Sequence, residues 1–532
     1  MSDSHVFVLH TDLMRLACDA WLVPGAITAD SFGPGRTWRQ ALPRRKQWRH
    51  APIPVGERSA LLADVDDDAP LPFLTDVTAS NRTPPSWFAD GARAFLQNAS
   101  RVLREHRPQP LHGRARHLLA LPLLGTRGGG AAIYSGEITS LLLPALQEEA
   151  RALGVDVALC LNEGASWAAA QKARRQLSGA FDALPAALRD KADALAVRAR
   201  NGGLTIFVGA GVSIPAGLPS WRALLRTIAD EILPHEQRPA FDELAVLDAA
   251  ALLQQRLPDD VTVNAATAWL LVERSRRYAL GHALLASLPV DEVVTTNYDP
   301  LFEEASADAG RPCARIPGRP VARGERFILK MHGCVTRPST IVLTREDYLR
   351  FHENKSALAG IVQALLLTRH MLFVGFGFTD DNFHRIAHAV RSALRGDDVD
   401  GVHEPFGTNL VLGGTLLKEL WQDDLDWIAM SEHAPALSTS EQARLVDIFL
   451  DRLSASAANV TSHLGDDRYA GVLSDGEKQL RAHLEQLLQA VTDDEKQTLA
   501  WDEVKDLLLK LGISPDGSPV RRRAATPPPT ER

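Results

Sequence analysis

The sequence predicts an α/β protein with two sheets, the second of them a doubly wound parallel sheet. Short apolar runs rich in Val, Ile, Leu and Phe alternate along the 532 residues with longer stretches of helical apolar period. Several of these runs pass directly into glycine or polar residues, as strands do where ligands bind at the carboxyl edge of a parallel sheet. An Ala- and Leu-rich segment at 166–200 separates two groups of runs, so we expect an α/β domain on each side of it.

The composition is that of a soluble globular protein and argues against several kinds of partner. With 45% hydrophobic and 23% charged residues, the chain has room for two to four domains. It contains no run of eighteen apolar residues, and its N-terminus lacks a basic region followed by an apolar stretch. We therefore expect no membrane association and a cytoplasmic location. The formal net charge of −8 argues against tight non-specific binding to nucleic acid.

The sequence predicts no metal site. Its four cysteines form no Cys-x-x-Cys pair, so neither a disulfide framework nor a thiolate zinc site is indicated. His384 and His388 lie four residues apart on a predicted helix, but they lack a third ligand. We interpret them as surface or packing residues.

The first domain is predicted to span residues 1–165. It has one clear helical pattern, at 136–153, and strand-like runs at 6–9, 20–23, 118–121 and 155–159. The intervening segment 30–116 is rich in Pro, Arg and Trp, and we expect it to be mostly irregular. Its basic run 36–50 includes Trp38 and Trp48 and could stack nucleic-acid bases, although a solvated basic loop is the favoured interpretation.

The remainder of the chain divides into four predicted parts. Residues 166–200 are a helical linker broken near Pro185, and residues 201–432 form the second α/β domain. Its expected strands are 204–208, 292–295, 327–331, 371–374, 410–412 and 427–430. A helical C-terminal region at 433–515 follows, and its stripe of Leu480, Leu484, Leu487 and Leu488 needs a partner surface, either in its own domain or in another copy of the chain. Residues 516–532, with three consecutive arginines and three consecutive prolines, are predicted to be disordered.

The segment 204–221 is the centre of the second domain. A buried strand at 204–208 runs into Gly209 and Gly211, which allow positive φ and a close backbone approach, and Pro219 is placed to open the next helix. A strand, glycine turn and helix start direct free N–H groups at a phosphate. The common dinucleotide fingerprint is excluded because Ile214 stands where it needs Gly or Ala, and a nucleophile elbow is excluded by Pro215.

Three further polar motifs follow predicted strands of this domain. They are Thr295-Thr-Asn-Tyr-Asp299, Lys330-Met-His-Gly333 and Gly375-Phe-Gly-Phe-Thr-Asp-Asp-Asn382. Because parallel strands present their carboxyl ends at one edge of the sheet, we expect these motifs to converge with the glycine turn.

In this order, the motifs resemble the sirtuin family over roughly residues 200–430, and the resemblance implies an NAD site. Asn297 would hold the nicotinamide ribose and its attacking water, Asp299 would hold the carboxamide, and His332 would be the general base. The resemblance implies that further residues line the dinucleotide: Gly209, Ala210, Gly211, Ser213, Gly217, Pro219, Trp221, Thr296, Gly375 and Gly377.

The chain also departs from the deacetylating sirtuins. It lacks their two Cys-x-x-Cys pairs, and Thr296 stands where they carry Gln before the catalytic Asn. It is similar instead to the divergent sirtuin-like branch of bacterial anti-phage systems, such as Thoeris effectors. That likeness implies an NAD hydrolase that releases nicotinamide and ADP-ribose in abortive infection, acting as a homo-oligomer and with a possible protein partner from a defence operon. A non-catalytic nucleotide-binding scaffold and a protein ADP-ribosyltransferase are the alternatives.

The first domain resembles the macro domain. Asp12 follows the first strand, and the run Gly125-Thr-Arg-Gly-Gly-Gly130 lies between a strand and a helix. The resemblance implies that Asp12 faces the base of an ADP-ribose-derived ligand and that its phosphates contact Gly125, Thr126, Gly128, Gly129 and Gly130. Pro24-Gly-Ala-Ile27 replaces the Asn-Ala-Ala-Asn segment of many macro domains, which favours binding over hydrolysis. A glycine-rich surface turn without a ligand is the alternative.

Overall fold

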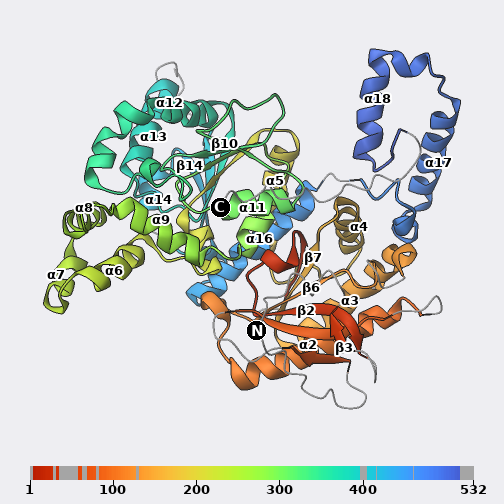
Figure 1. Cartoon of the computed structure of the whole chain (residues 1–532). Coiled ribbons are helices and arrows are strands. Elements are labelled where there is room, and N and C mark those ends of the chain that lie inside the picture. The colour runs from red at the N-terminus through yellow and green to blue at the C-terminus, as the bar shows by residue number, and fades with distance from the viewer. Residues whose placement is uncertain are drawn as a thin grey trace. The chain divides into compact units, whose positions relative to one another are not determined.

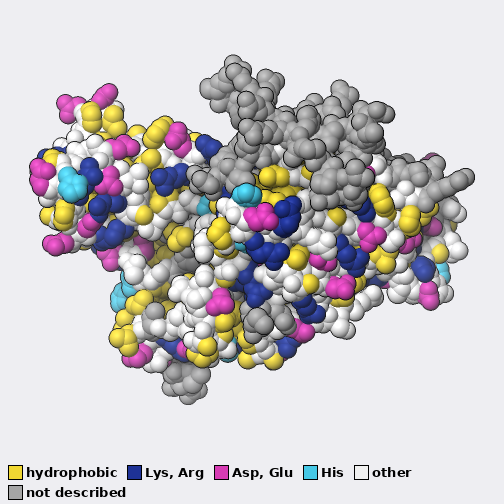
Figure 2. Space-filling model, turned by 90° about the horizontal axis from the view of Figure 1, so that it is seen from below, with side chains coloured by type: hydrophobic (Ala, Val, Ile, Leu, Met, Phe, Trp, Pro, Cys, Tyr) yellow, Lys and Arg dark blue, Asp and Glu magenta, His cyan; other side chains and the backbone are white. Residues whose placement is uncertain are grey.

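The computed structural model describes residues 4–27, 32–34, 58–62, 69–78, 83–126, 131–395, 404–414, 416–458 and 461–515. The chain folds as two compact units, each built around its own sheet (Figure 1). The first unit takes Met1–Pro185, Asp308–Gly310 and Ala458–Arg532, and the second takes Ala186–Ala307 and Arg311–Ala457. Within the described ranges, no helix has the length and apolar character needed to cross a membrane. Charged side chains of both signs are interspersed with apolar ones on the face drawn in Figure 2.

The first unit contains a mixed sheet in the order β1-β7-β6-β2-β5-β4, with β3 paired to β2. The five strands from β1 to β5 in this order are parallel, whereas β3 and β4 are antiparallel to their neighbours. Their bounds are β1 Val6–His10, β2 Ala20–Ile27, β3 Phe32–Pro34, β4 Ser59–Leu61, β5 Leu71–Asp76, β6 Leu118–Pro122 and β7 Asp156–Leu161. The four runs that the sequence indicated are therefore strands of this sheet.

The prediction that 30–116 is mostly irregular was wrong for the part of this segment that the structure describes. This segment supplies β4, β5 and the 21-residue helix α2 (Ser86–His106). Helix α2 buries Phe88, Ala92, Phe95, Leu96, Ala99 and Leu103, which recur at helical spacing. The Pro-, Arg- and Trp-rich composition of the whole segment concealed this period in the sequence. The basic run 36–50 lies outside the described residues.

The other helices of the first unit come from two parts of the chain, one near the sheet strands in the sequence and one near the C-terminus. Helix α3 (Ser135–Leu153) packs against α2 and ends at Gly154, whose φ of 71° is left-handed, and α4 (Gly164–Arg175) follows β7. The C-terminal elements are the 3₁₀ turn Asp467–Val472, α17 (Asp475–Ala490) and α18 (Leu499–Lys510). In α17, Leu484 and Leu488 pack toward the cluster formed by α18, while Leu480 and Leu487 remain exposed. The predicted leucine stripe is thus only partly covered within this unit.

The second unit contains seven parallel strands in the order β10-β11-β9-β8-β12-β13-β14. Their bounds are β8 Leu204–Val208, β9 Glu292–Thr295, β10 Ala314–Ile316, β11 Phe327–Lys330, β12 His370–Val374, β13 Gly407–Val411 and β14 Leu425–Ala429. Strands β9 and β11 follow β8 on one side of it in the sheet, and β12, β13 and β14 follow on its other side. The order reverses between β8 and β12, and this is where doubly wound sheets bind ligands.

Helices connect and cover these strands (Figure 1). One group, α5, α10 and α16, packs together, and α12 packs against α13. Their bounds, with those of the other helices of this unit, are α5 Ala186–Arg200, α6 Trp221–Ile232, α7 Arg238–Glu243, α8 Val246–Arg256, α9 Val263–Arg274, α10 Leu280–Ser287, α11 Leu301–Asp308, α12 Arg345–Thr368, α13 Asp381–Arg395, α14 Leu417–Trp421, α15 Met430–His433 and α16 Thr439–Ala457.

The six strands predicted for this unit are confirmed to within a few residues. The short strand β10, of three residues, was missed. The start of α6 also differs from the prediction, because two 3₁₀ turns, Ala210–Val212 and Ile214–Ala216, follow β8. Ser220 then caps α6 by accepting from the N–H of Ala223, so Pro219 precedes the cap and does not open the helix.

Candidate functional site

The four polar motifs converge at one edge of the second sheet, as their positions after strands predicted. Val208, at the end of β8, is in register with Thr295 of β9 and with Val374 of β12. Thr295 is in turn in register with Lys330 of β11. The carboxyl ends of β11, β9, β8 and β12 therefore lie side by side.

The glycines of this edge bring two loops into contact with each other. A Cβ on Gly209 would stand 2.3 Å from the carbonyl oxygen of Gly375, and one on Gly211 would stand 2.8 Å from its Cα. Gly209 has an extended φ of −102°, whereas Gly375 (φ 67°), Gly217 (φ 90°) and Gly333 (φ 88°) are left-handed. The glycines of the turn are needed for the close packing of backbone on backbone.

The expectation that this turn directs free N–H groups at a phosphate is wrong for four of its groups. The N–H of Gly209 donates to the carbonyl of Val374 at 2.9 Å, and that of Gly211 donates to the carbonyl of Gly375 at 2.9 Å. Two more donors, the N–H groups of Val212 and Ser213, bond within the turn. Gly377 differs, because it is exposed and a Cβ there would meet only Thr379 Oγ1, at 3.8 Å. The backbone of Gly377 is therefore accessible, unlike that of Gly209 and Gly211.

Asn297 is held by its amide nitrogen and leaves its amide oxygen unpaired. Nδ2 donates to the carbonyl of Gly209 and to Ser213 Oγ, both at 3.1 Å. A carbonyl oxygen only accepts, so the amide cannot be flipped without placing two oxygens together. Oδ1 is buried and has no hydrogen-bond partner among the described residues. The asparagine thus presents an oriented acceptor that lacks a donor.

Ser213 links Asn297, Asp299 and His282 through its hydroxyl. Its hydroxyl donates to Asp299 Oδ2 at 3.0 Å and lies 3.2 Å from His282 Nε2. Because the N–H of Ala279 donates to His282 Nδ1, the neutral ring carries its proton on Nε2 and donates to Ser213. The hydroxyl therefore accepts twice and donates once, which orders Ser213, Asn297 and Asp299 as one network.

The sequence reasoning missed His282, which lies in α10. It is fully buried, and this burial lowers its pKa to about 4, although the Asp299 carboxylate acts in the opposite direction. His282 is therefore neutral near pH 7. The available signal was a single titratable residue within the otherwise apolar helix Leu280–Ser287.

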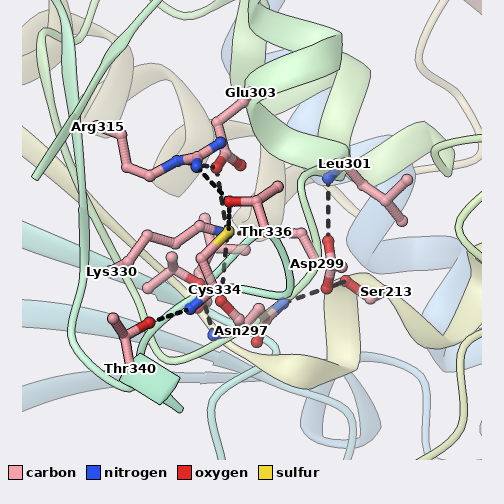
Figure 3. A network of polar contacts seen from close by, with 12 residues as sticks. Ser213, Asn297, Asp299, Leu301, Glu303, Arg315, Lys330, Cys334, Thr336 and Thr340 are labelled. Carbon is pink, nitrogen blue, oxygen red and sulfur yellow. Dashed lines mark hydrogen bonds and ion pairs between the residues drawn. The ribbon is translucent and has the colours of Figure 1, made fainter. Parts of the chain in front are cut away.

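A buried lysine ties the Asn297 loop to the strand that leads to His332 (Figure 3). Lys330 is 1% exposed, and its Nζ donates to the main-chain carbonyls of Asn297 and Asp299. The same Nζ lies 3.2 Å from Glu303 Oε1, which neutralises the buried charge. This contact fixes the backbone that carries the Asn297 side chain.

His332 lies in an aromatic enclosure on the same edge. It is fully buried, and its ring centroid lies 5.5 Å from that of Tyr348, 5.9 Å from that of Phe351 and 6.1 Å from that of Trp221. Neither ring nitrogen has a hydrogen-bond partner in the part of the chain that the structure describes. Burial lowers the pKa of His332, so the ring is neutral and able to accept a proton near pH 7.

Trp221 connects the His332 enclosure to the Asn297 loop. Its half-buried ring stacks on Tyr298, with centroids 5.7 Å apart, and also borders His332. Thr296, Asn297 and Asp299 are all buried in the same loop. The predicted residues of 209–221, 296–299, 332 and 375–377 therefore share one region of the sheet edge.

The candidate effector residues of the first unit also lie at strand ends. Asp12 follows β1 and Gly125 follows β6, and β7 lies between those two strands. One oxygen of Asp12 caps the turn Leu13–Arg15 by accepting from the N–H of Met14 at 2.9 Å. Gly125 has a φ of 76°, and a Cβ there would stand 2.4 Å from the ring of Phe88. Thr126 bonds to the carbonyl of Leu123, and Gly128, Gly129 and Gly130 lie outside the described residues.

No group of three His, Cys, Asp or Glu side chains in the described ranges is arranged to hold a metal ion. His384 instead packs: its Nε2 lies 2.8 Å from the carbonyl oxygen of Phe378.

Comparison with known proteins shows what part of the chain is similar to others. Residues 291–403 match the family described as SIR2-like domain. An NAD(+) hydrolase ThsA from Cytobacillus dafuensis is 33% identical over 199 residues, which cover 36% of this chain and 39% of that protein. The enzyme of the same name from Enterococcus faecium is 32% identical over 204 residues, covering 37% of this chain and 41% of the relative. Defense-associated sirtuin 2 from Bacillus subtilis is 25% identical over 213 residues, covering 39% of this chain and 21% of the relative.

These matches are partial. The chain spans about two fifths of the length of the NAD(+) hydrolases that it matches. It contains a SIR2-like domain at 291–403 and shares partial homology with NAD(+) hydrolases and a defence-associated sirtuin.

Proposed function

We propose that this protein hydrolyses NAD to nicotinamide and ADP-ribose at the carboxyl edge of β8, β9, β11 and β12. The observation that carries the proposal is the unpaired, oriented Oδ1 of Asn297. The Asn297 loop and His332 are neighbours, because the ring of Trp221 stacks on Tyr298 of this loop and also borders His332. An unpaired buried acceptor costs about 1–3 kcal/mol, so its presence points to a ligand or water that donates to it. The partial homology to NAD(+) hydrolases supports NAD as the substrate.

In the proposed step, Asn297 Oδ1 accepts a hydrogen bond from a water and holds it against the nicotinamide ribose. The water oxygen forms a bond to the ribose carbon as the bond from that carbon to the pyridinium nitrogen breaks. The electron pair of the broken bond leaves with neutral nicotinamide, and the water proton passes to His332. Because nicotinamide leaves as a neutral molecule, the protein needs mainly to orient the water and the ribose and to provide one general base.

The remaining predicted residues are proposed to bind the dinucleotide. Gly377 offers an open approach for the substrate, whereas Gly209, Gly211 and Gly375 shape the edge by packing on one another. Asp299 would hold the carboxamide from a carboxylate already fixed by Ser213 and by the N–H of Leu301. Ala210, Gly217, Pro219, Trp221 and Thr296 complete the proposed lining.

The test is product analysis with purified full-length protein and NAD labelled in the adenosine moiety. Hydrolysis predicts free ADP-ribose and nicotinamide in equal amounts. Label retained on protein would support the ADP-ribosyltransferase alternative. Binding of NAD without turnover, in the presence of candidate activating nucleotides and phage extract, would support the scaffold alternative.

We further propose that this activity serves anti-phage defence and is switched on by a signal or a protein partner. An enzyme that empties a cell of NAD must be silent until infection. The first unit would bind an ADP-ribose-derived ligand through Asp12, Gly125, Thr126 and Gly128–Gly130, and of these Asp12 and Gly125 follow parallel strands on either side of β7. Assembly as a homo-oligomer is proposed from the family resemblance, and the exposed Leu480 and Leu487 of α17 are candidates for such a surface.

A further inference from the structure

A carboxylate faces the proposed base from the β12 loop. Asp380 Oδ2 lies 3.5 Å from His332 Nε2, and the exposed fractions of the two side chains are 10% and 0%. This pair comes from the motif after β12 and the motif after β11, which are separated in the sheet by β9 and β8.

The carboxylate of Asp380 is itself held on both oxygens. Tyr348 donates its hydroxyl proton to Oδ2 at 2.7 Å, and Oδ1 accepts from the N–H of Phe383 at 2.9 Å as α13 begins. Two hydrogen bonds from different elements therefore fix the carboxylate on the side of the imidazole where Nε2 lies. Capping α13 requires only the bond from Phe383 to Asp380, so the bond from Tyr348 serves a further purpose.

The backbone that delivers Asp380 adopts a costly conformation. Phe378, two residues earlier, has a left-handed φ of 52°, which costs a non-glycine residue of order 1 kcal/mol or more. Its ring is buried against those of Phe373, Phe376 and Trp421, and its carbonyl bonds to His384. Packing thus enforces a loop path that places Asp380 opposite His332.

The other groups around His332 are neutral or positive. Helix α12 contributes Tyr348 and Lys355, and the ammonium of Lys355, which donates to the carbonyl of Thr340, acts to lower the pKa of His332. Trp221 faces the ring from α6. Burial is the largest cause of the lowered pKa, and Asp380 opposes it. Asp380 is thus the carboxylate within ion-pair distance of the imidazole among the described residues.

We propose that Asp380, held by Tyr348, is the positioning residue of the proposed base. Its negative charge, 3.5 Å from Nε2, favours the form of neutral His332 that carries the proton on Nε2, leaves Nδ1 to accept the proton of the attacking water, and stabilises the imidazolium that forms. This proposal rests on the proposed NAD hydrolysis and names the partner of its base. A carboxylate hydrogen-bonded to the catalytic imidazole contributes about 10⁴-fold to turnover in serine proteases, and a smaller effect is expected for the 3.5 Å contact of Asp380.

The test compares Asp380→Asn with the control Asp381→Asn, which removes the same charge at the next, exposed residue. Activity requires neutral His332 and is lost as pH falls through its pKa. Since the carboxylate raises that pKa, Asp380→Asn is expected to move the acid limb of kcat/KM to lower pH. It should also reduce kcat on the order of 100-fold, with KM for NAD changed only a few-fold. Asp381→Asn should retain the wild-type profile, and Tyr348→Phe should shift the limb in the same direction by less.

A second readout does not depend on turnover. Nitrogen chemical shifts of the His332 ring, measured by NMR across pH, report which nitrogen carries the proton. The wild type is expected to show the Nε2–H form, and Asp380→Asn a lower pKa and a mixture of forms. If the ring shifts and the acid limb are the same in wild type and Asp380→Asn, the proposal is overturned. Wild-type protein with the expected ring shifts but no NAD cleavage would instead contradict the proposed function alone.

Discussion

Asn297 and His282 show how single side chains prepare this site. The amide of Asn297 is oriented by the carbonyl of Gly209 and by Ser213, and Ser213 is oriented in turn by His282. The histidine can serve as a donor on Nε2 and an acceptor on Nδ1 only while it is neutral. Its burial, which lowers its pKa to about 4, keeps it in this form over the physiological range.

Protonating His282 should therefore destabilise the second unit. Its folded pKa of about 4 lies below the ordinary value of 6.5, so the unfolded chain binds the proton first. The stability contributed by the neutral ring is complete above pH 6.5 and is lost as pH falls toward 4, by about 3 kcal/mol in total. Denaturant unfolding across pH 4–7 measures this loss. His282→Gln should weaken the pH dependence, and an unchanged slope would contradict the assignment.

Motif spacing could identify Asn297 and His332 as candidates, because ordered residues after strands are visible in a sequence. It could not identify His282, Lys330 or Asp380 as their supports. Those roles depend on which buried atoms face each other, for example Lys330 Nζ against the carbonyls of Asn297 and Asp299. Such contacts join segments that are far apart in the chain, and they leave no local pattern.

At the scale of elements, the strands of the second sheet were predictable and the function of their glycines was not. Buried parallel strands are apolar on both faces and stand out as runs. The loops after β8 and β12 meet only in the folded chain, so the contact of Gly209 and Gly211 with Gly375 could not be read from spacing. Helix α2 was missed because the Pro-, Arg- and Trp-rich composition of 30–116 indicated an irregular segment, whereas its burial beside α3 and the first sheet overrides propensity.

Two glycine variants separate loop packing from ligand binding. Gly211→Ala places a Cβ 2.8 Å from Gly375 Cα, so the two loops must move apart and stability should fall by about 1–3 kcal/mol. Gly377→Ala meets no such contact, and its melting temperature should match the wild type. If NAD approaches at Gly377, this variant should raise KM for NAD without loss of stability. Wild-type KM in Gly377→Ala would argue that NAD does not approach there.

At the scale of the whole molecule, the chain combines two α/β units with separate cores. The C-terminal segment from Ala458 belongs to the first unit, although α16, which precedes it, packs with α5 and α10 in the second. The sequence indicated two α/β parts and C-terminal helices. It could not assign those helices to a unit. The apolar stripe of an amphipathic helix indicates that one face is buried, but it does not identify the surface that covers this face.

The proposed switch makes a prediction at this scale. To move the chain from about 1% to about 99% active, a signal must bind the active form more tightly by roughly 5.5 kcal/mol. Calorimetry with ADP-ribose and its cyclic or conjugated forms should detect binding to the full chain, and Asp12→Ala should weaken it. The same ligand should activate NAD cleavage in the wild type. Absence of binding by all these compounds would exclude the sensor role.

The central claim is that Asn297 and His332 together cleave NAD. The most direct measurement is the rate of nicotinamide release from NAD by the wild type, Asn297→Ala and His332→Ala, each checked for wild-type folding by circular dichroism. The oriented amide oxygen and the neutral buried imidazole predict that each variant loses on the order of 100-fold or more in turnover. Near-normal nicotinamide release by both variants would contradict the assignment of this edge as the active site.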